Sequence, residues 1–374
     1  MNAFADWKYI PILAISPAEM VALEQLPDKD KSSLLPLFPL KGWASAHRLE
    51  SAIKRIKTSI DDRPWIADID INYLMGNKVY LFTGRFPDTP VYKELSDLLD
   101  SSNGYHNWCE FISNEAMAIP CIRHESLDGL DTQISRLASL DRGVVFRISP
   151  SLANLEKHAI VLNSIARVGA SDVLVIYDLG AIDENYHENI PRLQRFLLDA
   201  KEIVPDVALS ISASSFPNGF ARQERGENSI YERILYNNVA SQGLHPTLIY
   251  SDRGSARAEK QAGGAGTPPP RIDYPLKKDW KFVRREVDDN LPDSRTRRKA
   301  AYIEIANEIV SADYWQPELR LWGTQQIELT AIGDEYAIYS PQRSTAARIN
   351  IHLFVQLHYD AEPATINTDE EWVD

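Results

Sequence analysis

Acidic side chains close several of the apolar segments that we interpret as strands. Asp68 and Asp70 end the segment WIADID, and a spacing of two residues places both carboxylates on one face of an extended strand. Asp178 ends a later apolar segment and could complete a set of oxygen ligands for a hard divalent ion. We therefore take Asp68, Asp70 and Asp178 as candidate ligands of Mg²⁺, although the sequence leaves the cofactor open.

Two arginines end neighbouring apolar segments. Arg123 and Arg147 could grip a phosphate or a carboxylate through paired hydrogen bonds. With a bound metal, they would suit hydrolysis of a phosphate ester. The candidate catalytic set is Asp68, Asp70, Arg123, Arg147, Asp178 and Asp252. The alternative is that these acids and arginines pair with each other where the strands meet water, so the sequence does not decide whether the protein is an enzyme.

A strand–helix–strand unit at residues 143–180 indicates what would position these charges. Gly143–Ile148 is a short apolar run, Pro150 and Ser151 open an amphipathic helix, and Asp172–Asp178 is a second apolar run. Two apolar strands joined by a helix are typical of a parallel βαβ unit.

The unit repeats along the chain, which favours an α/β fold. Eight strand–helix steps predict a single (β/α)8 TIM-barrel-like domain over residues 1–374, in which the carboxyl ends of the strands form the mouth. A doubly wound open sheet is the alternative, but no glycine-rich nucleotide turn follows the first strand. The expected strands are Lys8–Ala14, Leu34–Leu40, Trp65–Asp70, Ala118–Arg123, Gly143–Ile148, Asp172–Asp178, Asp206–Ala213 and Leu248–Tyr250.

The later part of the chain departs from the simple repeat. Residues 253–290 are expected to form a flexible basic insertion between the eighth strand and its helix, because AGGAGTPPP at 262–270 resembles a linker. Residues 311–374 would be a C-terminal extension packed on the barrel. We also expect a small hairpin at Lys78–Thr83 and a short strand at Gln325–Thr330.

The charge is unevenly distributed. The 374 residues carry a formal net charge of −13, which argues against general nucleic-acid binding. Residues 251–300 hold 13 Lys and Arg against 8 Asp and Glu, a balance of +5, so the remainder carries −18. Aromatic residues interleave with these cations, and residues 253–300 could bind single-stranded nucleic acid or an acidic partner.

Membrane and export features are not expected. No apolar run approaches the ~20 residues of a membrane helix, and the start lacks a basic region before its apolar stretch. The two cysteines, Cys109 and Cys121, match no metal spacing or disulfide framework, which fits a cytoplasmic location. The oligomeric state is not indicated.

The order of the apolar segments resembles the Beta protein family, which is known from satellite phages and bacterial mobile islands. The resemblance spans essentially the whole chain. It is carried by KYIPIL with a following Ser-Pro helix, LLPLFPL, WIADID, VVFRIS, LVIYDLG, LIYSDRGS, WGTQQIEL and RINIHLFVQLHY.

The resemblance implies a barrel-like α/β protein with a role in phage–host conflict, either in anti-phage defence or in neutralising a toxic gene product. It places the candidate acids and Arg147 on matching strand ends. Ala14 stands where a basic residue is expected, and Phe38-Pro39-Leu40 lacks an expected acid. We therefore expect a binding or regulatory barrel that acts through a co-encoded protein partner. The alternative is a metal-dependent phosphoesterase or nuclease-like hydrolase at the barrel mouth.

Overall fold

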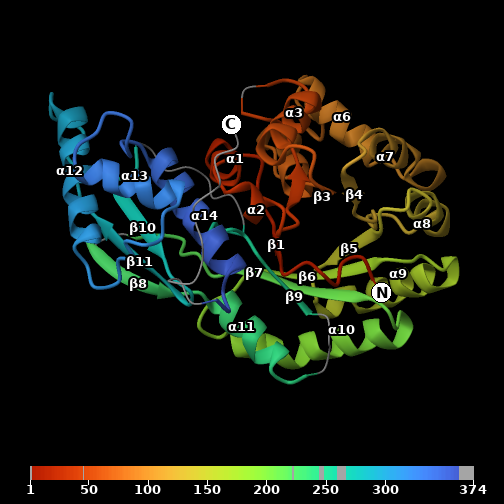
Figure 1. The fold of residues 1–374 in the computed structure, drawn as a ribbon. Coiled ribbons are helices and arrows are strands. Elements are labelled where there is room, and N and C mark those ends of the chain that lie inside the picture. The colour runs from red at the N-terminus through yellow and green to blue at the C-terminus, as the bar shows by residue number, and fades with distance from the viewer. Residues whose placement is uncertain (1, 45, 221–222, 244–247, 259–266, 362–374) are drawn as a thin grey trace, which may run out of the picture.

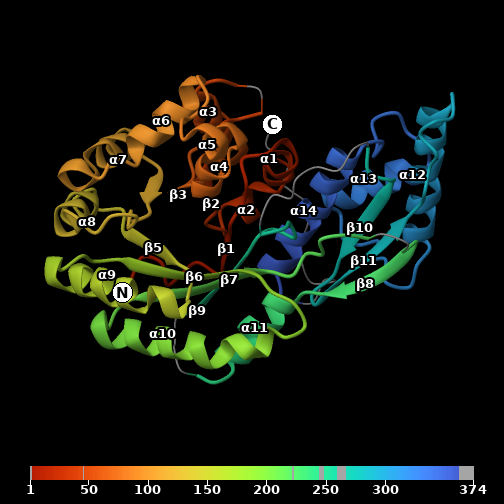
Figure 2. The same ribbon diagram turned by 180° about the vertical axis from the view of Figure 1, so that it is seen from behind.

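The computed structural model describes residues 2–44, 46–220, 223–243, 248–258 and 267–361. Two parallel sheets lie side by side, and an antiparallel sheet lies at one end of the molecule (Figures 1 and 2). The larger parallel sheet has the order β1 (Tyr9–Pro11), β9 (Leu248–Asp252), β7 (Ala208–Ser214), β6 (Val173–Ala181) and β5 (Val144–Ile148). The smaller has the order β2 (Leu37–Leu40), β3 (Trp65–Ile69) and β4 (Ala118–Pro120). The antiparallel sheet has the order β10 (Arg271–Pro275), β11 (Asp279–Arg284) and β8 (Arg225–Ser229).

Helices cover the outer faces of the sheets. Those of the first half are α1 (Pro17–Glu24), α2 (Asp28–Lys31), α3 (Leu49–Ile60), α4 (Ile71–Met75), α5 (Lys78–Thr83), α6 (Pro90–Leu98), α7 (Ser102–Asn114), α8 (Leu130–Ala138) and α9 (Leu155–Val168). Those of the second half are α10 (Ile190–Ile203), α11 (Tyr231–Ala240), α12 (Ser294–Val310), α13 (Trp322–Ala331) and α14 (Pro341–Leu357). Within the described ranges, no helix is both long and apolar enough to span a bilayer.

The expected closed (β/α)8 barrel is wrong, because the described strands do not form one closed ladder. The five-stranded and three-stranded parallel sheets are joined only by single bridges, Ile12 with Leu37 and Cys121 with Val145. The strands at these junctions contain Pro11, Pro39 and Pro120. Proline has no backbone N–H to donate, so a continuous ladder is interrupted there. The strand–helix repeat also breaks after β7, which is followed by β8, and after β9, which is followed by β10.

Two short apolar segments that were predicted to be extended are helices. Lys78–Thr83 is the helix α5 instead of a hairpin, because Asn77 caps its start and Gly84 ends it with a left-handed conformation. Gln325–Thr330 lies inside the helix α13 instead of forming a strand. Short apolar runs fit both periods, and here the packing of α13 against α12 and α14 decides for the helix.

Part of the basic segment after β9 forms a sheet. Residues 271–275 and 279–284 pair as the hairpin β10–β11, and β11 also pairs with β8. Most of the expected linker lies outside the described residues, which include only its last four positions, 267–270. The predicted division of the chain into one domain with an insertion and an extension stays a prediction.

Alternation along the parallel strands produces two faces. One face carries a compact apolar cluster that includes Ile66, Cys121, Val145 and Ile176. Two residues after each of them come the charged residues Asp68, Arg123, Arg147 and Asp178. Side chains two residues apart share a face in an extended chain, so this cluster lies next to the charged residues on the same face. The other face packs on the helices through the larger core cluster.

Candidate functional site

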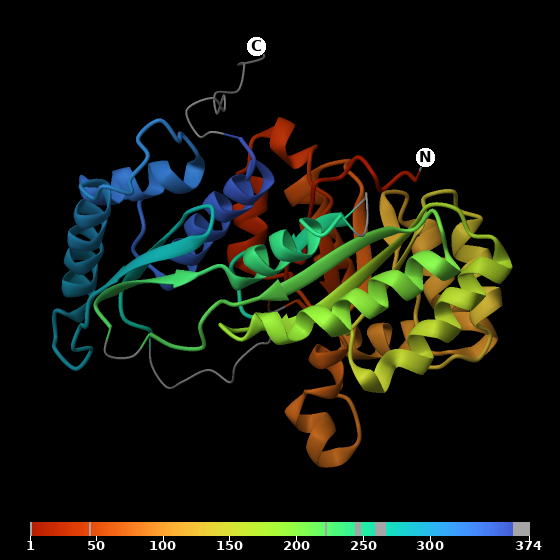
Figure 3. The ribbon, with the colours of Figure 1, turned by 90° about the horizontal axis from the view of Figure 1, so that it is seen from below.

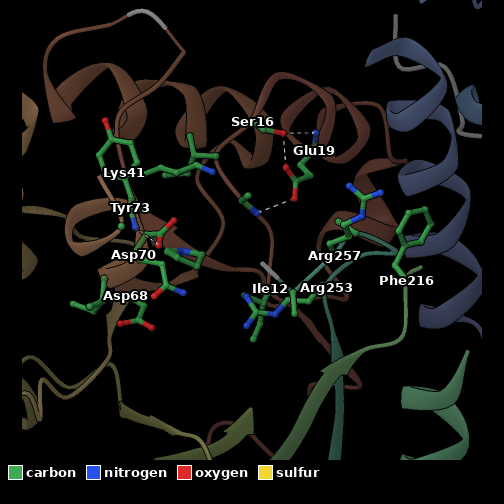
Figure 4. A pocket seen from close by; sticks show the side chains of 18 of the residues that line it. Ile12, Ser16, Glu19, Lys41, Asp68, Asp70, Tyr73, Phe216, Arg253 and Arg257 are labelled. Atoms are coloured by element: carbon green, nitrogen blue, oxygen red, sulfur yellow. Dashed lines mark hydrogen bonds between the residues drawn. The ribbon is translucent and has the colours of Figure 1, made fainter. Parts of the chain in front are cut away.

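A large pocket opens where the parallel strands end. Its volume is about 1960 Å³, and residues from both parallel sheets, α1, β10, β11, α12 and α14 line it. Figure 4 shows Asp68, Asp70 and Lys41 on one side, Arg257 and Phe216 on the other, and Arg253 between them. Nine Lys and Arg and five Asp and Glu side chains line the pocket, a formal balance of +4. The pocket is therefore cationic although the whole chain is acidic.

Four of the six predicted catalytic residues meet in this pocket as a chain of ion pairs. Arg147 contacts Asp68 through Nη1 at 2.6 Å and Asp178 through Nη2 at 2.5 Å. Arg123 pairs with Asp68 and also with Glu125. The predicted proximity of Arg123, Arg147, Asp68 and Asp178 is present in the structure, and so is the alternative prediction that they pair with each other.

Arg253 completes the chain, and the sequence-based set missed it. Its Nη2 contacts Asp178 Oδ2 at 2.6 Å. The alternation Ile249, Ser251, Arg253 continues the inward face of β9 past its end, so a period of two counted through that segment would have identified it. With Arg253 included, three arginines balance the three carboxylates of Asp68, Asp178 and Glu125.

These carboxylates stay ionised because the arginines outweigh the effect of burial. Burial alone would raise the pKa of Asp68, but Arg123 and Arg147 lower it to about 2. Burial acts against Asp178 as well, yet Arg253 and Arg147 lower its pKa. Backbone amides add support, since Ile69 N donates to Asp68 at 2.8 Å and Gly180 N donates to Asp178 at 3.0 Å.

Asp70 lines the same pocket but has a different local partner. The strand β3 ends at Ile69, and Asp70 is the N-cap of α4, accepting a hydrogen bond from Tyr73 N at 2.9 Å. Over the part of the chain that the structure describes, no group of three or more His, Cys, Asp or Glu is arranged to hold a metal ion. The structure therefore gives the predicted Mg²⁺ no three-carboxylate site at Asp68, Asp70 and Asp178.

Asp252 lies on the opposite face of its strand, outside the pocket. It is fully buried and accepts hydrogen bonds from Tyr9 at 2.6 Å and Tyr250 at 2.8 Å, and it contacts His352 of α14 at 2.7 Å. Its neighbours Ser251 and Arg253 are one residue away and so face the other side. Asp252 therefore ties β1 and β9 to α14 and does not join the charge chain.

Further pocket residues come from parts of the chain that the strand-end rule does not cover. The sequence identified the basic segment but did not place it beside the strand ends. Folding brings there Arg257, Arg271, Arg284 and Arg348, together with Phe216, Phe220 and Tyr302. Arg348 lies on α14, and no motif around it in the sequence marks it as a pocket residue.

Comparisons with known proteins agree on one family. The model of the Beta protein family matches residues 9–358. Protein beta of Enterobacteria phage P4 is 26% identical over 364 residues, which cover 95% of this chain and 94% of the phage protein. Both findings confirm the predicted resemblance. They give no support to the expected terms of anti-phage defence and toxin neutralisation.

Proposed function

Because this chain belongs to the Beta protein family, which has a member in phage P4, we propose that it is a regulatory binding protein that acts through a protein partner. The proposal leaves out anti-phage defence and toxin neutralisation. The observation that carries it is an apolar segment that projects from the body. The ion pairs at the pocket support it, because they already engage the carboxylates that a metal would need.

The projecting segment contains α4 and α5 and is drawn in orange below the body in Figure 3. It exposes large apolar side chains: Phe82 is 87% exposed and Leu81 68%. None of the residues of α5 is buried. Apolar side chains gathered at an exposed tip favour contact with another molecule.

Internal packing holds the segment in shape without covering its tip. Tyr80 stacks on Phe86 with ring centroids 4.5 Å apart, and Tyr73 stacks on Tyr92 at 5.0 Å. A preformed apolar projection loses little conformational freedom on binding. Lys78 and Arg85 flank the tip in sequence, so the complementary partner is a protein with an apolar groove and an acidic rim.

The ion pairs disfavour the alternative of a metal-dependent phosphoesterase or nuclease-like hydrolase. Asp68 and Asp178 already accept from arginines and backbone amides, so their oxygens are engaged. A metal would have to displace these partners. The balanced ion pairs at the strand ends suit rigid recognition better than metal chemistry.

The test is recovery of partners from cells that carry the gene with its natural neighbours. We compare the tagged wild-type chain with Phe82→Asp, and with Ile332→Asp as a matched control because Ile332 is an apolar residue 79% exposed outside this segment. The proposal expects a neighbour-encoded protein that co-purifies with wild type and Ile332→Asp, and at least about tenfold less with Phe82→Asp.

Two outcomes would contradict the proposal. One is equal recovery of every co-purifying protein with Phe82→Asp. The other is Mg²⁺-dependent hydrolysis of nucleotide phosphate esters by the purified chain that disappears in a folded Asp68→Asn variant, which would support the hydrolase instead.

A further inference from the structure

The pocket has a second charged region, away from the chain of ion pairs. It comes from the segment after β9, from the antiparallel sheet and from α14, and it is formed by Arg257, Arg271, Arg284 and Arg348. We call these four residues the arginine wall. They bring to one side of the pocket four guanidinium groups that are up to about 90 residues apart in sequence.

Acidic partners at the arginine wall are fewer than the arginines. Asp273 serves two of them, with its carboxylate 3.0 Å from Arg271 and 2.8 Å from Arg348. Arg284 pairs with Glu286, whose side chain is 66% exposed. Arg257 donates to backbone oxygens that follow β7 and, in the described ranges, has no ion pair with a carboxylate.

Two buried donors at this wall have unused hydrogen-bonding capacity. Arg348 is 4% exposed and Tyr302 is 1% exposed, and both line the pocket. Neither Arg348 Nε nor Tyr302 Oη has a hydrogen-bond partner among the described residues. Buried polar atoms without partners are rare in folded proteins, because leaving them unsatisfied costs free energy. An anion in the pocket would supply the missing acceptor.

Aromatic rings hold two of the four guanidinium groups in position. Arg271 lies 3.7 Å from the ring centroid of Phe220, and Arg348 lies 4.1 Å from that of Phe216. A guanidinium stacked on a ring keeps its edge free for hydrogen bonds. The wall is therefore preformed for a ligand that accepts several hydrogen bonds in a planar, forked arrangement.

We propose that the arginine wall binds the phosphate groups of a small phosphorylated ligand of about nucleotide size. Guanidinium forks match phosphate oxygens in geometry and charge. The pocket balance of +4 leaves a formal charge of −17 on the rest of the chain, since the whole carries −13. The cationic pocket attracts an anionic ligand that fits inside it, whereas a long nucleic acid would extend onto the acidic surface and be repelled there.

The test is a calorimetric titration of the purified full-length chain with pyrophosphate and with ATP at constant ionic strength. The variants are Arg257→Gln and Arg284→Gln, neither of which removes a partner from a buried carboxylate. The control is Arg195→Gln, because Arg195 is 66% exposed on α10 and does not line the pocket. We expect each wall variant to bind both probes about tenfold more weakly and the control to bind like wild type.

Each other outcome overturns the proposal. These are no binding of either probe at millimolar concentration, wall variants that bind like wild type, an equal loss with Arg195→Gln, and binding confined to a single-stranded 20-nucleotide DNA. Thermal unfolding of the unliganded variants shows whether they are folded. The site is independent of the partner role, so Phe82→Asp should bind ATP like wild type even if the partner proposal fails.

Discussion

Arg147 holds Asp178 of the neighbouring strand through two hydrogen bonds to the same oxygen. Its Nε lies 3.0 Å and its Nη2 2.5 Å from Asp178 Oδ2. Arg253 contacts that oxygen as well, at 2.6 Å. One buried carboxylate therefore bridges two partly buried arginines. Its removal would leave Arg147 with Asp68 alone and Arg253 without an ion-pair partner among the described residues.

We predict that Asp178→Ala strongly destabilises the protein. Breaking a buried ion pair by removing one partner costs about 3–5 kcal/mol, because an uncompensated charge stays buried. Denaturant unfolding measures this as a lower midpoint with an unchanged slope. The control is Asp131→Ala, since Asp131 forms an exposed pair with Arg167 and such pairs contribute less than ~1 kcal/mol. Similar losses in both variants would refute the structural role of Asp178.

A second prediction concerns the pH dependence of stability through Glu232 of α11. Burial and then the nearby Asp252 raise the pKa of Glu232 to about 8. In the unfolded chain the group titrates near 4.5. Between these values the unfolded state has lost the proton and the folded state keeps it, so stability falls as pH rises from 4.5 to 8.

Glu232→Gln should remove this loss, because the amide does not ionise. Urea unfolding at pH 5 and pH 8 should show a smaller decrease for the variant than for wild type, by up to a few kcal/mol. The exposed Glu202 provides the control, and Glu202→Gln should keep the wild-type profile. A wild-type decrease that persists in Glu232→Gln would assign the pH dependence to another group.

The third prediction is that both cysteines are unreactive in the folded protein. Burial raises the pKa of Cys109 to about 11 and that of Cys121 well above its usual value. The thiolate is the reactive form, so a disulfide reagent at pH 8 should label neither residue on the time scale of a small-thiol control. Guanidinium chloride should expose both. Rapid labelling of one thiol in the native chain would show that its segment opens.

The residues of the candidate site that lie at the end of a predicted strand could be identified from the sequence. Asp68, Arg123, Arg147 and Asp178 follow apolar runs at a spacing of two, and parallel strands bring such ends together. Asp252 was misplaced because β9 runs to Asp252, two residues past the expected end at Tyr250. Alternation puts Asp252 on the same face as Tyr250, whereas Arg253, one residue further, faces the pocket. Arg253 occupies the position that Asp252 was expected to have.

The fold was predictable in its local units but not in its closure. The run from β5 to β6 appears as expected, with parallel pairing from Val144 with Val173 onward. The closed barrel failed at strands that contain proline, where only single bridges form. Apolar patterning identifies strands, but it does not show whether enough backbone hydrogen bonds form between neighbouring strands to close the sheet.

The sequence by itself determined where the eight described parallel strands lie along the chain, the charged strand ends and the family, because these depend on residue type and on spacing within one segment. Only the tertiary structure decided that the acids and arginines neutralise each other and that Asp252 faces α14. It also decided that Arg348 of α14 joins Arg257 and Arg271 at one wall of the pocket. Such contacts join residues that are distant in sequence, so they depend on how sheets and helices pack and leave no local pattern in the chain.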